Sequence, residues 1–85
     1  MNSEWANMRE IGRLFGQTSH DVGRILKHHD YRFENGKPTK KSFDAGFVRE
    51  HFVNGFYSWT WHVERTSALL ESFGWKRRNS SPTKI

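Results

Sequence analysis

The sequence has no cysteine, which excludes disulfide bonds and thiolate metal sites. No apolar run approaches the roughly 20 residues that a membrane-spanning helix needs. The first residues also lack the basic and then apolar pattern of a secretory signal. We therefore expect a soluble, cytoplasmic protein that has no membrane partner.

Large apolar side chains are few, and most of them are aromatic. The chain has 85 residues, of which 15% are aromatic, including four Trp and seven Phe. A chain of this length buries one modest core, so a few aromatic rings must supply much of it. We expect a single domain over residues 1–75. Residues 76–85 contain Ser, Pro and charge with little to bury, so we expect a disordered tail.

Acidic residues are fewer than basic ones, 9 against 14, which gives a net charge of +5. The excess is unevenly distributed, because residues 1–30 carry four basic and four acidic side chains. The last ten residues carry four basic side chains and no acidic one. The basic character is therefore concentrated in the tail and argues only indirectly for a polyanionic partner.

Residues 8–29 predict two short amphipathic helices joined by a tight turn. Apolar residues recur at i, i+3, i+4 spacing in two stripes: Ile11, Leu14 and Phe15, then Val22, Ile25 and Leu26. Asn7 with Glu10 predicts a capping box for the first helix, over 8–15. Gly16 ends that helix, and Thr18 caps the second, over 19–29.

The segment over residues 31–45 contains signals for a turn and a short helix. Tyr31 and Phe33 alternate as in a short strand, and Asn35-Gly36 predicts a turn after them. A short helix is expected over 39–45, with Thr39 as its cap. Three lysines make this region locally basic: Lys37, Lys40 and Lys41. They either contact phosphates or are ordinary surface residues that keep the protein soluble.

Asn54-Gly55, between two aromatic and β-branched runs, predicts a β-hairpin with a two-residue turn. This turn pairs Val53 with Phe56 and continues down the ladder, so that alternate residues share a face. We expect the Trp-rich face to be the core side: Val48, Glu50, Phe52, Tyr57, Trp59 and Trp61. Glu50 is the misfit on this face, so either it lies at the rim or a bulge changes the register. A last helix is expected over 63–73, ended by Gly74.

The helix pair resembles the helix-turn-helix family, with Gly12 at the close crossing, Gly16 in the turn and Thr18 as the hydroxyl cap. Gln17 departs from the family, which usually has an apolar residue there. The whole order of elements resembles an α+β winged helix, in particular the C-terminal domain of phage antirepressors (KilA-C type). That resemblance is carried by Glu10-Ile11-Gly12, Leu26, Tyr31, Asn35-Gly36-Lys37-Pro38 and residues 43–47.

The resemblance implies a transcriptional or phage-type regulator that binds double-stranded DNA, with helix 19–29 reading the major groove. Residues at the cap and on the outward side of that helix are the expected groove contacts: Thr18, Ser19, His20, Gly23, Arg24 and Lys27. Gly23 would let the helix approach DNA closely. Basic residues of the loop and tail are the expected phosphate contacts: Lys37, Lys40, Lys41, Lys76, Arg77 and Arg78.

Two other classes of function are alternatives to DNA binding. A protein-interaction module on the same fold would suit the neutral helix pair, and an exposed aromatic patch would favour it. An enzyme or metal protein is not expected, because the five histidines lack zinc-motif spacing and no nucleophile–base pair is recognisable. No cofactor is expected. A single reading helix covers a short site, so we expect a homodimer or a larger assembly on DNA.

Overall fold

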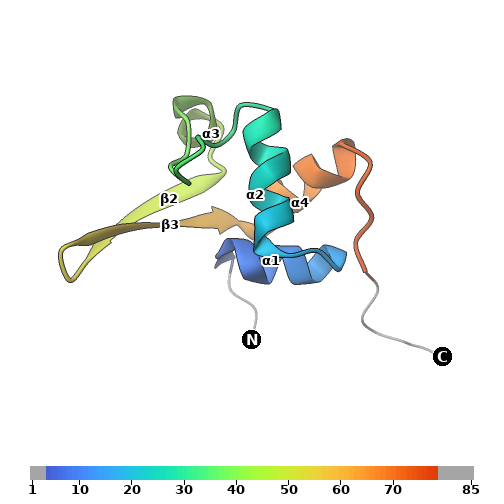
Figure 1. The fold of residues 1–85 in the computed structure, drawn as a ribbon, viewed down its shortest axis with the longest axis horizontal. Helices are drawn as coiled ribbons and strands as arrows, with labels where there is room; N and C mark the ends of the chain where they lie inside the picture. The colour runs from blue at the N-terminus through green and yellow to red at the C-terminus, as the bar shows by residue number, and fades with distance from the viewer. Residues whose placement is uncertain (1–3, 79–85) are drawn as a thin grey trace.

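Four helices and three strands form the part of the chain that this computed structural model describes, residues 4–78 (Figure 1). Their order is β1 (Trp5–Ala6), α1 (Met8–Phe15), α2 (Ser19–His28), α3 (Lys40–Asp44), β2 (Val48–Val53), β3 (Phe56–His62) and α4 (Val63–Ser72). The α+β class expected from the sequence is confirmed. Within residues 4–78, no helix has the length and apolar character needed to cross a membrane.

Helices α1 and α2 begin at the capping boxes that the sequence predicts. The Asn7 side chain accepts from the Glu10 amide at 2.9 Å, and the Glu10 carboxylate accepts from the Asn7 amide at 3.1 Å. Thr18 and Asp21 make the equivalent pair for α2. Each box satisfies amides that the first turn of a helix leaves unpaired. Helix α2 ends at His28, one residue before the predicted boundary.

The turn between α1 and α2 requires glycine at two positions. Gly16 has a φ of 70°, in the left-handed region that glycine adopts without steric cost. Gly12 lies against the turn itself, where an added Cβ would be only 2.5 Å from the Gln17 carbonyl oxygen. The close crossing expected at Gly12 is confirmed, and this contact sets how tightly the turn folds over α1.

The sheet is antiparallel with the strand order β1-β3-β2, so β3 is central. The hairpin has the predicted register, with Val53 opposite Phe56 and Phe52 opposite Tyr57. Trp61 pairs with Ala6 on one side and with Val48 on the other. These three residues form the only part of the sheet that is buried among the described residues.

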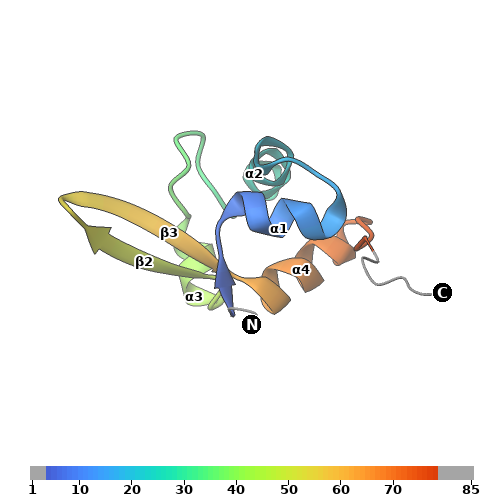
Figure 2. The same ribbon diagram turned by 90° about the horizontal axis from the view of Figure 1, so that it is seen from below.

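The core lies between this end of the sheet and helices α1, α2 and α4. Its buried apolar residues are Ala6, Ile11, Phe15, Val22, Leu26, Val48, Trp61 and Leu70. The outer part of the hairpin extends away from the helices (Figures 1 and 2). The expectation that the whole Trp-rich face is core is therefore wrong: Phe52 is 63% exposed and Tyr57 is 61% exposed. No helix reaches far enough along the hairpin to cover them.

The segment between α2 and α3 departs from the predicted strand. Arg32 and Pro38 form an isolated bridge, and no strand is formed at Tyr31 to Phe33. The predicted turn at Asn35-Gly36 is present, with Gly36 at a φ of 93°. Thr39 occupies the cap position of α3 but makes no side-chain cap bond. Its hydroxyl donates instead to the Asp30 carbonyl at 2.7 Å, which fastens α3 to the end of α2.

We predict that Gly12→Ala destabilises the protein by about 1–3 kcal/mol, because the Gln17 backbone cannot move away without opening the turn. Helix propensity alone would make the same change stabilising by roughly 0.5–1 kcal/mol, so the sign is informative. Urea denaturation followed by circular dichroism measures the difference. Arg13→Ala, at an exposed position of the same helix, is the control. A Gly12→Ala variant as stable as wild type would contradict the close crossing.

Candidate nucleic-acid interface

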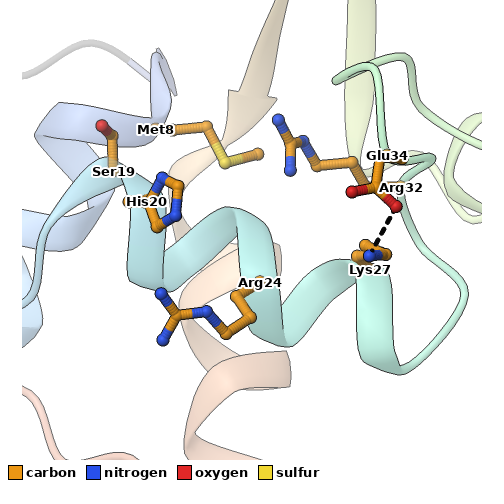
Figure 3. Close-up of a pocket in the computed structure, with 7 residues that line it drawn as sticks. All are labelled: Met8, Ser19, His20, Arg24, Lys27, Arg32 and Glu34. Atoms are coloured by element: carbon orange, nitrogen blue, oxygen red, sulfur yellow. Dashed lines mark ion pairs between the residues drawn. The ribbon is translucent and has the colours of Figure 1, made fainter.

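The outward side of α2 borders an open pocket of about 480 Å³ (Figure 3). Ser19, His20, Arg24 and Lys27 contribute to its wall, and all four are exposed. Their helical spacing places them on one side of α2, opposite Val22 and Leu26 in the core. Four of the predicted contact residues therefore do lie together. The other lining residues are Met8, Arg32 and Glu34.

Arg32 is the residue in this pocket that sequence reasoning missed. Its side chain extends from the loop after α2 across the outward side of the helix, toward Met8 (Figure 3). A Cβ added to Gly23 would lie 2.5 Å from Arg32 Nη1, and one added to Gly36 would lie 3.1 Å from Nη2. Two glycines therefore provide the space for one guanidinium. Gly23 is buried beneath Arg32, so the guanidinium lies where the sequence predicts a close approach of DNA.

The cations of this pocket differ in how they are paired. Lys27 Nζ lies 2.7 Å from Glu34 Oε1, and this hydrogen bond holds the pKa of the Glu34 carboxyl below its usual value. Arg24 lies 3.5 Å from Asp21 in a looser, exposed pair. Arg32 makes no ion pair and no side-chain hydrogen bond with any described residue, although its charge, after that of Lys27, also helps to lower the pKa of Glu34. Its five N–H donors are therefore available to an anion.

A second pocket, of about 530 Å³, adjoins the first and shares Met8, Ser19 and Arg32 with it. It leads from α2 to the base of the hairpin, where Trp59 contributes to its wall. We call the two pockets together the basic cleft. Four cationic side chains, Arg9, Arg24, Lys27 and Arg32, line it against one carboxylate, Glu34. The N-terminus of α2 at Ser19 adds the positive end of a helix dipole.

The predicted loop lysines lie outside the two pockets. Lys40 is paired with Asp44 at 2.8 Å, which raises the pKa of the lysine. Lys41 donates to the His29 carbonyl at 3.2 Å and lies over the Tyr31 ring at 4.2 Å. These contacts place both side chains around α3 and the C-terminal end of α2. Lys37 is exposed on the loop and lines neither pocket.

The described part of the basic tail contacts the helices. Arg77 binds Glu64 and Glu71 of α4, each at 3.3 Å. The Arg78 amide donates to the Leu14 carbonyl, and its side chain lies next to Gly16. Arg77 and Arg78, which the sequence assigns to a disordered tail, make these contacts on a different part of the molecule from the cleft. Lys76 is exposed, and residues 79–85 lie outside the described part of the chain.

Within residues 4–78, no group of three or more histidine and carboxylate residues is placed to hold a metal ion. No model of a known protein family, no curated protein and no solved structure matches this chain. What the structure defines is a small α+β domain with helices on a three-stranded antiparallel sheet. Its candidate site is a cationic cleft between α2, the Arg32 loop and the hairpin.

The Thr18–Asp21 box at the start of α2 generates a prediction about pH. The Thr18 hydroxyl donates to Asp21 at 2.9 Å, and this bond, with the Thr18 amide and Arg24, lowers the Asp21 pKa below 3.8. Because the pKa of Asp21 is lower in the folded than in the unfolded protein, the ionised carboxylate stabilises the fold at any pH above the unfolded-state pKa. This stabilisation is lost as the pH falls through the folded-state pKa. We expect Thr18→Val to return the Asp21 pKa toward 3.8.

Titration of the side-chain carboxyl signals by NMR measures this change. The Glu34 carboxyl, which Lys27 and not Thr18 perturbs, is the internal control and should titrate as in wild type. An unchanged Asp21 titration in Thr18→Val would show that the cap bond does not form in solution. We also expect Thr18→Val to cost about 1 kcal/mol of stability at neutral pH.

Proposed function

We propose that this protein binds double-stranded DNA as a winged helix-turn-helix module of the kind used in transcriptional or phage regulation. In this proposal α2 enters the major groove, and the β2–β3 hairpin is the wing. The capped helix pair, the tight turn at Gly12 and Gly16, and the hairpin that closes the core all support it. The resemblance in sequence adds the expectation of a regulatory role.

The observation that carries the proposal is the Arg32 guanidinium. It is held between Gly23 and Gly36, half-buried, with no carboxylate bound to it. The planar donors of a guanidinium match a phosphate in two hydrogen bonds, and here no carboxylate has to be displaced first. The other cations of the cleft extend this attraction along a polyanion. Among polyanions, duplex DNA is the one that the proposed helix-turn-helix geometry fits.

Three residues of α2 are the proposed contacts with base edges. Ser19 and His20 are exposed at its N-terminal end, which is the part that enters the groove in this class of protein. Arg24, 68% exposed, is bound only loosely to Asp21 and can exchange that carboxylate for a guanine edge. Lys27 is better placed for phosphate, once Glu34 releases it. Since one such helix covers a short site, we propose that the protein acts on DNA as a homodimer.

We predict that Arg32→Ala weakens binding to duplex DNA roughly tenfold at low salt, as expected for the loss of a charged hydrogen bond. The slope of log affinity against log salt should fall by about one, because one phosphate contact is lost. Fluorescence anisotropy with a labelled duplex of mixed sequence, titrated at several salt concentrations, measures both quantities.

Lys40→Ala is the matched control, because it removes the same charge from an exposed side chain outside the cleft. Its effect on affinity should be clearly smaller than that of Arg32→Ala. Equal losses in the two variants would mean that only net charge matters and that the cleft is not the site. Wild-type protein that binds no duplex at low salt would overturn the proposal itself.

A protein-interaction module is the second candidate, and one observation favours it. The end of the hairpin exposes four apolar side chains: Phe52, Val53, Phe56 and Tyr57. Exposed aromatic clusters of this kind often mark binding surfaces. Phe47 and Trp75, which the sequence also suggested for such a patch, pack instead against the core.

A further inference from the structure

The hairpin carries exposed aromatic rings that the fold does not use. Phe52 and Tyr57 face each other across β2 and β3, with ring centroids 4.8 Å apart. Trp59 follows Tyr57 on the same face of β3, two residues nearer the core. We call Phe52, Tyr57 and Trp59 the aromatic face. Most of the surface of Phe52 and Tyr57 is in contact with solvent, which is costly unless something covers it.

The aromatic face opens directly from the basic cleft. Trp59 belongs to both, since it also contributes to the wall of the cleft beside Arg9 and Arg32. A ligand that lies along the hairpin therefore meets aromatic rings at one end and guanidinium groups at the other. A positively charged groove joined to a row of exposed rings is the combination that binds single-stranded nucleic acid.

The spacing of the rings suits bases that have left a helical stack. Alternate residues on a strand lie about 6.8 Å apart, twice the roughly 3.4 Å rise per nucleotide in a stacked strand. Tyr57 and Trp59 can then each stack on a separate base, and Phe52, which packs against Tyr57, enlarges the surface offered to the first of them. A duplex offers these rings no base faces, because its bases already stack on one another. We propose that the aromatic face binds unpaired bases, while Arg9 and Arg32 hold the phosphates of the same strand.

This inference rests on the proposed binding of nucleic acid in the cleft, but it does not need α2 in a major groove. A second copy of the chain is a poorer occupant. The tip presents one apolar pair on each face, Phe52 with Tyr57 and Val53 with Phe56, whereas a standard protein interface uses about 20–30 residues a side. A narrow two-sided tip is a shape suited to meeting single bases.

Glu50 is the carboxylate on this face of the hairpin, opposite Trp59 and exposed. Its charge repels phosphates from the edge of β2. The strand's phosphates should therefore lie on the side of Arg9 and Arg32, with the bases toward the rings. Removing this charge while keeping the shape, as in Glu50→Gln, is expected to tighten binding of a single strand.

The test uses the full chain and labelled 12-nucleotide oligo-dT, with a 12-base-pair duplex in parallel, by fluorescence anisotropy at low salt. The double variant Phe52→Ala, Tyr57→Ala should bind oligo-dT more weakly, by roughly fivefold or more for each ring lost. Its affinity for the duplex should fall by a clearly smaller factor, because a duplex offers these rings no base faces. Phe52→Tyr and Tyr57→Phe, which keep a ring, should bind oligo-dT as wild type does.

The matched control is Val53→Ala, Phe56→Ala, which removes the apolar pair on the opposite face of the same tip. Both pairs are largely exposed, so neither double variant should unfold, and circular dichroism checks this. The control should leave oligo-dT binding close to wild type. Glu50→Gln should bind oligo-dT more tightly than wild type.

Three results would overturn the inference. Wild type that binds duplex but not oligo-dT would reject the aromatic face and leave the proposed function intact. Equal losses from the two double variants would show that the face has no special role. Self-association in sedimentation that Phe52→Ala, Tyr57→Ala abolishes without any effect on oligo-dT would assign the rings to a protein contact. Wild type that binds oligo-dT but no duplex would instead remove the proposed function and keep the inference.

Discussion

The burial of Trp61 holds this small domain together. Trp61 lies on the central strand, is 2% exposed, and pairs with Ala6 on one side and with Val48 on the other. Its side chain packs in the same cluster as the buried residues of α1, α2 and α4. One large side chain thus joins the sheet to the helices. A chain of this length cannot build a second such centre, because its surface is large relative to its volume.

That constraint explains the exposed half of the hairpin. The helices cover the sheet only where Trp61 and Val48 lie, and β2 and β3 continue beyond them into solvent. Aromatic residues there do not stabilise the core. The two ends of the hairpin therefore have different roles. The base of the hairpin contributes to the core, and the tip exposes aromatic rings to solvent. The same division leaves Trp59 between the two, half-buried at the edge of the basic cleft.

The candidate site depends on backbone space as much as on charge. Gly23 lies inside α2 and Gly36 lies in the turn that follows Asn35, yet both make room for the Arg32 guanidinium. The neighbouring cations Lys27 and Arg24 are held by Glu34 and Asp21. Of the four cations of the cleft, Arg32 lies against the two glycines without an ion pair, and Lys27 and Arg24 can exchange their carboxylates for another anion. This is a different arrangement from a uniformly basic surface, and it concentrates the attraction for an anion at one place.

The sequence by itself determined what depends on neighbours along the chain. Caps at Asn7 and Thr18, the glycine turn at Gly16 and the Asn54-Gly55 hairpin register all follow from local backbone chemistry, and they were predictable. Only the tertiary structure decided which surfaces are covered. A period-2 pattern shows that Tyr57 and Trp61 share a face, but not how far the helices reach along it. Arg32 was missed for the same reason: a glycine inside a helix signals a close approach, but only the folded chain shows what approaches.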